Sequence, residues 1–360
     1  MRLLRTTLVL VLAFAPSLFA QTTNPVVAYA YAGTGSNRIF AYAVRANGTT
    51  TALPGSPFTG PGIRVVNTTN FLFATDFTNI ITYQRSSTGA IHPVATINGV
   101  AHNDTPADSE VGFLTLDRTG ASLYAGEINF QSTGNNAFAE FAKQSNGSLQ
   151  FRANTPINVN DGGPLVFSTN NAFAYGTGCT MATWTIFGFF RAPNGTLTSF
   201  DPGTTIPPTT TVDLCPGAAA SYSRGYLAVA YSTVAAVPVW SIAIYQISSS
   251  GSLRRVSTHS TTFPSISSMR FDQTGNFLAV GGKGIAIYRL NSNATITKLS
   301  GRIDTSVNFN SVVWDHNSHV LATSSSAFYG FNVRLGVISQ VGSSHPIGSS
   351  GTNVAVIPLH

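Results

Sequence analysis

The chain has 360 residues, of which 43% are hydrophobic, 11% aromatic and only 9% charged. Low charge and high apolar content exclude an intrinsically disordered chain and provide enough material for a large core. The formal net charge is +6, but the basic residues are scattered along the chain. A nucleic-acid-binding surface needs clustered basic residues, so we expect no nucleic-acid partner.

The first residues resemble an export signal. Arg2 and Arg5 precede an apolar run from Leu8 to Ala20, which has signal-peptide length and is too short to span a bilayer. The pattern predicts a signal peptide over residues 1–20, with an uncleaved anchor as the alternative. Residues 21–360 are then a single domain without a membrane span, secreted or periplasmic. Cleavage would remove two of the basic residues.

A tight turn follows an aromatic-containing strand seven times. The segments include FAYAVRANG, TYQRSSTG, EFAKQSNG and GFFRAPNG, and Asn-Gly and Ser-Gly pairs tolerate the positive φ of a hairpin. The turn positions are Gly48, Gly89, Gly147, Gly195, Gly251, Ala294 and Gly336. A second turn precedes each aromatic strand, as in LDRTGASLYAG and FDQTGNFLAVG.

Each repeat therefore reads as four antiparallel strands, which we call the inner, second, third and outer strands. Units of this length and number predict an all-β fold, a single seven-bladed β-propeller with almost no helix. Val26 begins the first repeat directly with a second strand, and an orphan strand, Asn353 to Leu359, ends the chain. We expect this C-terminal strand to complete the first blade and close the ring, which would remove exposed sheet edges. A frayed tail is the alternative.

The segments PGSPFTGPG, SLYAG and FLAVGG resemble the bacterial seven-bladed lactonase-like propellers, which include phosphogluconolactonase-type and YVTN-repeat proteins. The resemblance covers Val26 to Leu359. The enzymes of that family carry a G-P-R-H segment that enters an inner strand, and an N-E pair after the second strand that follows it. Here Glu127 falls at the glutamate position behind Gly126, and the preceding segment, TPADSEVGF, has no Arg-His pair.

Other chemistry-bearing motifs are missing from the sequence. The glycines of YAGTGSN and VGGKG do not open a helix, and there is no G-x-S-x-G or H-E-x-x-H motif, so we predict no cofactor. His316 and His319 are interpreted as solvated turn residues. The first functional interpretation is a non-catalytic binding or scaffold module of the cell envelope, a monomer with a small ligand or an envelope partner. The alternatives are a lactone hydrolase, which rests on the resemblance, and a structural surface protein.

Loop positions sort the charges onto two faces. We expect an acidic face, formed by the loops after second and outer strands, and a basic face formed by tight hairpins. The predicted acidic set is Asp76, Asp104, Asp108, Glu110, Glu127, Asp161, Asp213 and Asp304. Long loops are the usual carriers of binding residues. The segment from His102 to Glu110, with Asp76 and Glu127, is therefore our candidate ligand or cation site, and ordinary solvated loop charge is the alternative.

Two arginines and two cysteines complete the predicted set. Arg270 lies within an inner strand, where it could line the channel and meet an anion; solvation by channel water is the alternative. Arg64 follows Gly60-Pro61 at the entry to another inner strand, and we assign it to the same face as the acidic loops and to the ligand-binding residues. Cys179 and Cys215 are assigned to one face of the fourth blade. In an oxidising compartment we expect them to form a disulfide, with two free thiols as the alternative.

Overall fold

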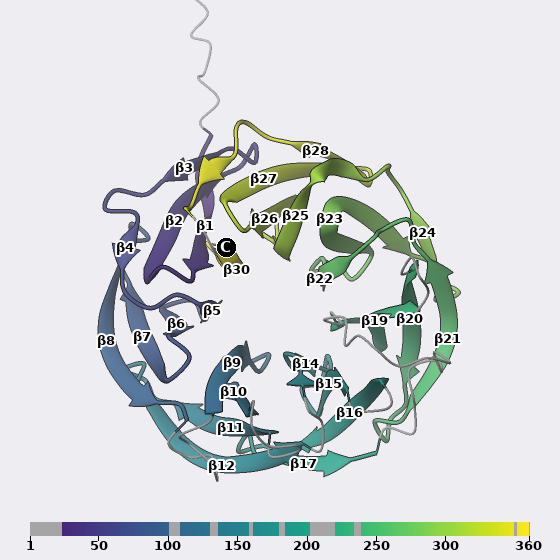
Figure 1. Ribbon diagram of the computed structural model, residues 1–360, viewed down its shortest axis with the longest axis horizontal. Coiled ribbons are helices and arrows are strands. Elements are labelled where there is room, and N and C mark those ends of the chain that lie inside the picture. The colour runs from purple at the N-terminus through teal and green to yellow at the C-terminus, as the bar shows by residue number, and fades with distance from the viewer. Residues whose placement is uncertain are drawn as a thin grey trace, which may run out of the picture.

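The computed structural model describes residues 24–100, 109–129, 136–157, 161–179, 184–201, 220–233, 239–348 and 351–359. All regular structure in these residues is β-strand, and none of it is a helix that could cross a membrane. The sheets stand around a common centre in a propeller arrangement (Figure 1). Strands β5, β9 and β22 lie toward the centre, while β8, β12 and β21 lie on the rim.

Five sheets consist of one repeat each. The first has the order β3-β2-β1-β30, with β4 also paired to β2. The others are β5 to β8, β9 to β12, β13 to β17 and β18 to β21. The strand bounds of the first two are β1 (Val26–Thr34), β2 (Arg38–Arg45), β3 (Thr50–Ala52), β4 (Phe58–Thr59), β30 (Gly351–Pro358), β5 (Arg64–Asn67), β6 (Phe71–Thr75), β7 (Asn79–Arg85) and β8 (Ile91–Asn98). Those of the next three are β9 (Ser109–Leu116), β10 (Ser122–Asn129), β11 (Asn136–Lys143), β12 (Leu149–Ile157), β13 (Asp161–Gly162), β14 (Val166–Phe167), β15 (Phe173–Cys179), β16 (Trp184–Arg191), β17 (Leu197–Phe200), β18 (Ala220–Ser223), β19 (Tyr226–Thr233), β20 (Val239–Ile247) and β21 (Leu253–Ser260).

The sixth sheet has eight strands because one long strand joins two repeats. The first part of β25 pairs with β23, as Ile303 opposes Ile285, and its last part pairs with β26, as Val312 opposes Ala322. The bounds are β22 (Ile266–Phe271), β23 (Phe277–Leu290), β24 (Ile296–Lys298), β25 (Ile303–Trp314), β26 (His319–Ser324), β27 (Ala327–Arg334), β28 (Val337–Gln340) and β29 (His345–Pro346).

The second and third strands are buried because neighbouring sheets cover both of their faces. All of Phe71 to Thr75 is buried, and so are the inner residues of β1 and β26. The hydrophobic clusters accordingly lie between sheets: one joins β15 and β16 to β19 and β20. Strands buried on both faces read as continuous apolar runs rather than alternating ones.

Each tight hairpin packs on the sheet before it. Gly89, Gly195 and Gly251 have φ values of 86°, 95° and 88°, where glycine is favoured. Their carbonyls accept hydrogen bonds from tyrosine hydroxyls of the preceding sheet, Tyr31 at 2.7 Å, Tyr124 at 2.6 Å and Tyr175 at 2.6 Å. The hairpins therefore share one face of the molecule. We call it the hairpin face, and the opposite face, with the loops after second and outer strands, the loop face.

The C-terminal strand lies beside the first strand of the structure. β30 pairs antiparallel with β1, with Tyr29 opposite Ile357 and Ala32 opposite Val354. Side chains also link successive inner strands: Ser268 accepts from the Val312 amide, and Ser311 accepts from the Val354 amide.

Candidate functional site

Arg64 stands at the loop-face end of the inner strand β5. Its Nε donates to the carbonyl of Gly112 in β9 at 2.9 Å, and its guanidinium lies 5.6 Å from the ring centre of Phe113. The side chain is half-buried, and desolvation lowers the pKa of Arg64. The Arg64 guanidinium is thus held between the inner strands β5 and β9. Its bond to Gly112 uses the Nε–H group and does not involve the N–H groups of Nη1 and Nη2.

A β-bulge in β9 sets the surroundings of Arg64. The pairing of β9 with β10 shifts between Gly126 and Glu127, which oppose Phe113 and Val111, so Gly112 is the extra residue. Glu127 therefore lies opposite Val111, which is the residue next to Gly112, and Arg64 bonds the carbonyl of Gly112. The bond of Arg64 to Gly112 and the register of β10 thus place Arg64 and the backbone of Glu127 on either side of one short segment of β9, although they belong to different sheets.

Asp76 lies in the loop between β6 and β7, close to the bulge of β9, and its carboxylate holds this loop. Its carboxylate accepts from the amides of Thr78 at 3.0 Å and Asn79 at 2.6 Å, and from the Asn79 side-chain amide at 3.1 Å. The loop is in turn tied to β9, since the Val111 amide donates to the Phe77 carbonyl at 2.5 Å. A carboxylate with three protein donors is committed to holding the turn.

The remaining predicted acids are only partly described. Glu110 is half-buried in β9 opposite Ile128, next to the bulge. His102, Asp104, Asp108 and Asp213 lie outside the described residues. Asp161 opposes Cys179 in another sheet, and Asp304 is the second residue of β25. The register thus gathers Asp76, Glu110 and Glu127, whereas Asp161 and Asp304 belong to other sheets.

Arg270 lies at a different level of the ring from Arg64. It stands two residues before the hairpin that begins at Asp272, and Arg64 stands four residues before the equivalent Thr68. Arg270 is exposed, yet desolvation lowers its pKa, a combination expected of a side chain that water reaches but protein surrounds on all sides. Its Nη1 donates to its neighbour's carbonyl, that of Met269, at 3.0 Å. Arg270 therefore stands nearer the hairpin face than Arg64 does.

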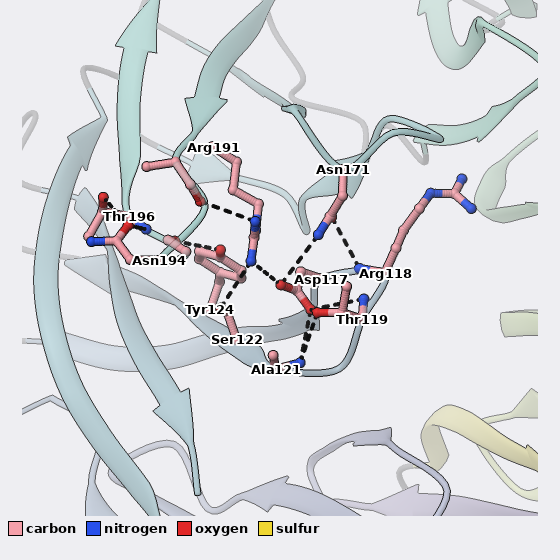
Figure 2. Close-up of polar contacts among 12 residues, drawn as sticks. Asp117, Arg118, Thr119, Ala121, Ser122, Tyr124, Asn171, Arg191, Asn194 and Thr196 are labelled. Carbon is pink, nitrogen blue, oxygen red and sulfur yellow. Dashed lines mark hydrogen bonds and ion pairs between the residues drawn. The ribbon is translucent and has the colours of Figure 1, made fainter.

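The hairpin face contains a buried ion pair that the sequence did not predict (Figure 2). Arg191 Nη2 lies 2.5 Å from Asp117 Oδ2, and both side chains are almost fully buried. Asp117 also accepts from the Thr119 and Ala121 amides at 3.1 Å each. Burial raises the pKa of Asp117, but these hydrogen bonds and Arg191 outweigh it, so that its pKa is lowered. The pair joins the β9–β10 hairpin to the end of β16 and is structural.

The interpretation of His319 as a solvated turn residue is wrong. His319 is 2% exposed, and its Nδ1 lies 2.6 Å from Oδ2 of the fully buried Asp315. Its ring packs against Gly48, whose added Cβ would lie 2.8 Å from His319 Cδ2. The turn WDHNSH therefore holds one histidine inside, at the contact with the first sheet, while His316 remains exposed.

The described residues contain no cluster of three or more histidine, cysteine or acidic side chains that could hold a metal ion. Cys179 ends β15, but Cys215 lies outside the described part of the chain, so the disulfide remains a prediction.

Solved structures similar to this chain are β-propellers. The periplasmic gluconolactonase PpgL of Pseudomonas aeruginosa superposes with a TM-score of 0.70 at 13% identity, over 93% of this chain and 100% of its own. A protein of Lactobacillus plantarum gives 0.68 at 13% identity, over 92% and 99%. A putative 6-phosphogluconolactonase of Bacteroides fragilis gives 0.66 at 12% identity, over 92% and 98%.

No protein-family model matches the sequence, and no curated protein matches it either. The likeness to the solved structures lies in the fold, which is that of 6-phosphogluconolactonase-like β-propellers over most of the chain.

Proposed function

We propose that the protein is a lactone hydrolase whose site lies on the loop face between β5 and β9. One observation carries the proposal: the Arg64 side chain bonds Gly112, beside the residue that opposes Glu127. A fixed cation and a carboxylate-bearing position thus meet near the centre of the ring. Two structures of the same fold are described as a gluconolactonase and a putative 6-phosphogluconolactonase, which supports this function over a scaffold role.

The chemistry requires a base and a group that stabilises negative charge. Water attacks the lactone carbonyl carbon, the ring C–O bond breaks, and the products are a carboxylate, a hydroxyl group and a released proton. Glu127 takes the proton from the attacking water, as general bases do. Arg64 stabilises the oxyanion that forms on the carbonyl oxygen, because a donor fixed beforehand needs little reorganisation.

Hydrolysis of D-glucono-1,5-lactone, followed by acid release with a pH indicator, tests the proposal. We expect a rate above spontaneous ring opening. Arg64→Gln should lower it by roughly a hundredfold or more, the usual loss for one oxyanion donor. Glu127→Gln should also lower it, whereas Arg289→Gln, on the hairpin face, is the matched control. A wild-type rate equal to the spontaneous one would reject the activity toward this lactone.

Binding without turnover is the second candidate, and the segment TPADSEVGF favours it because it has no Arg-His pair. Calorimetry with gluconate and with the lactone separates the two functions. A binding module should bind one of them, lose that binding in Arg64→Gln, and show no turnover. A purely structural surface protein should bind neither.

We also propose that the ring has seven four-stranded blades. The division of β25 between two partners supports counting the eight-stranded sheet as two blades. The pairing of β30 with β1 supports closure by the C-terminal strand. Deletion of residues 353–360 tests this closure.

Export to the periplasm is part of the same proposal. The sequence pattern of residues 1–20 and the periplasmic location named for PpgL support it. Cell fractionation and N-terminal sequencing of the mature protein would test it, with Gln21 expected as the first residue.

A further inference from the structure

The hairpin face carries a basic residue at the end of most third strands. The last residue of β2, β7, β11, β16 and β27 is basic, and so is the residue before the last in β23. These residues are Arg45, Arg85, Lys143, Arg191, Arg334 and Arg289. Arg224 adds a further exposed cation from the β18–β19 hairpin. Because all these strands end at the same face, the cations lie on one side of the disc.

The acids of this face are used inside the protein. Asp117 pairs with Arg191, and Asp315 contacts His319. Asp272 accepts from the Phe277 amide at 2.9 Å and from Thr274 Oγ1 at 2.5 Å. Asp315 and Asp272 are therefore directed at their own hairpins, whereas Asp117 neutralises Arg191 of the next sheet. The positive charge of this face then comes from the other cations.

Neutral carbonyl groups position several of the cations. Arg85 Nε donates to the Thr69 carbonyl at 2.9 Å, and Arg224 Nε donates to the Thr274 carbonyl at 3.2 Å. Arg45 Nη1 donates to Asn24 at 2.8 Å. A backbone carbonyl fixes a guanidinium without cancelling its charge, so the hairpin face presents oriented positive charge.

An exposed apolar residue, Leu335, lies beside these cations. It stands at the tip of the β27–β28 hairpin, is 98% exposed and has a φ of 51°. The left-handed conformation costs a residue with a Cβ roughly 1–2 kcal/mol, and in five of the other hairpins between third and outer strands the residue with positive φ is a glycine. The exposed Arg334 precedes it, and Val337, 59% exposed, follows the turn. Folding gains nothing from a leucine at this position.

We propose that the hairpin face docks on an anionic phospholipid bilayer, with Leu335 inserted between the headgroups. Cations beside an exposed apolar side chain are the combination that binds a lipid surface, because the lipid supplies both negative charge and a hydrocarbon layer. A polysaccharide or nucleic acid supplies the charge but has no apolar layer for Leu335. Docking in this orientation leaves the loop face, with Arg64, directed away from the membrane. The proposal is independent of lactone hydrolysis.

Flotation of the full-length mature protein with vesicles tests the docking. We expect binding to vesicles of phosphatidylglycerol mixed with phosphatidylcholine, much weaker binding to phosphatidylcholine alone, and release by added salt. Arg334→Gln should weaken binding about fivefold, as should Arg289→Gln, which corresponds to about 1 kcal/mol for each cation near the surface. Lys283→Gln, an exposed lysine between the second and third strands of its repeat, is the matched control and should bind normally.

Leu335→Asn is the decisive variant, because asparagine tolerates positive φ better than leucine. It should leave the melting temperature unchanged or raise it, yet weaken vesicle binding about tenfold. Phe77→Asn is its control: Phe77 is also exposed, at 38%, with a φ of 79°, but lies on the loop face. Equal binding to both lipid mixtures, or normal binding by Leu335→Asn, would overturn the proposal. Binding of a soluble sulfated polysaccharide in preference to vesicles would also overturn it.

Discussion

The side-chain amide of Asn353 forms two hydrogen bonds with the backbone of Val65. Oδ1 accepts from the Val65 amide at 2.9 Å, and Nδ2 donates to the Val65 carbonyl at 2.8 Å. Asn353 belongs to β30, the last strand of the chain, and Val65 follows Arg64 in β5. One side chain thus imitates the pairing of a strand and joins the C-terminal strand to the inner strand that carries the candidate site.

Replacing Asn353 by alanine should destabilise the protein. The change leaves an amide and a carbonyl of β5 without partners, so we expect the free energy of unfolding to fall by about 1–3 kcal/mol. Asn353→Asp keeps the acceptor for the Val65 amide but loses the donor and places a negative charge beside the Val65 carbonyl, so it should be destabilised as well. Urea unfolding of the three proteins measures the differences. Identical midpoints for wild type and Asn353→Ala would show that the bonds contribute nothing.

Deletion of residues 353–360 should have a much larger effect. It exposes an edge of β1 that β30 covers, and exposed strand edges promote association. We expect a broad, less cooperative melting transition and oligomers in size-exclusion chromatography. A truncated protein that stays monomeric and melts like the wild type would contradict closure by the C-terminal strand.

Asp117→Ala should cost about 3–5 kcal/mol of folding free energy, because it leaves Arg191 buried without its partner. Asp272→Ala is the matched control, since Asp272 occupies the equivalent turn and accepts hydrogen bonds from Thr274 and Phe277 within that turn. That control should lose only about 1 kcal/mol. Chemical unfolding at neutral pH compares the two variants, and equal losses would contradict a role for the ion pair.

The ion pair also predicts a pH dependence. The folded-state pKa of Asp117 is lowered, so its contribution to stability is present above its ordinary pKa of 3.8 and is lost as the pH falls through the folded value. Asp117→Asn should therefore be less stable than wild type at neutral pH, with a gap that narrows in acid. Unfolding curves from neutral pH into acid would show this, and a constant gap would speak against it.

The repeat pattern predicted the propeller because hairpin glycines and buried aromatic strands recur in every sheet. Tyr31, Tyr124 and Tyr175 repeat because each anchors the next hairpin, and such regular local signals are readable in a sequence. The Asp117–Arg191 pair was not predicted. Its two residues belong to different sheets, and their meeting depends on how the sheets pack rather than on any spacing in the chain.

The candidate site itself stays a prediction, and only part of its geometry was readable from the sequence. Loop assignment placed Asp76, Glu110 and Glu127 on one face, and the strand register gathers them. The contact of Arg64 with Gly112 was not foreseen, because it depends on a bulge in β9. A glycine inside the strand SEVGFLTL was the available signal, since such glycines often mark bulges or close approaches.

Cys179 and Cys215 should form a disulfide in the exported protein. Cys179 ends β15, and an oxidising compartment favours pairing when only two cysteines are present. Mass spectrometry of unreduced peptides should find the two cysteine peptides linked. Two alkylatable thiols in the native protein would contradict the prediction. In that case Cys179→Ser would have the same stability as wild type, with or without reductant.

Glu140 should make the protein less stable as the pH rises. It is fully buried between sheets, with Oε1 accepting from Thr155 Oγ1 at 2.5 Å and from the Leu197 amide at 3.0 Å. Desolvation raises the pKa of Glu140, and these bonds only partly oppose it. A raised folded-state pKa means that the favourable contribution is complete below the ordinary value of 4.5 and is lost as the pH rises through the folded value.

Glu140→Gln isolates this effect, because glutamine keeps an oxygen acceptor for Thr155 and Leu197 but cannot ionise. We expect the variant to gain stability relative to wild type as the pH rises from the ordinary glutamate pKa of 4.5 through the raised folded-state value. Glu110→Gln, at a half-buried glutamate of β9 in the same sheet, is the control for simple loss of charge. Urea unfolding across this pH range measures the difference. A difference between Glu140→Gln and wild type that does not change with pH would show that Glu140 is ionised to the same extent in the folded and unfolded chain.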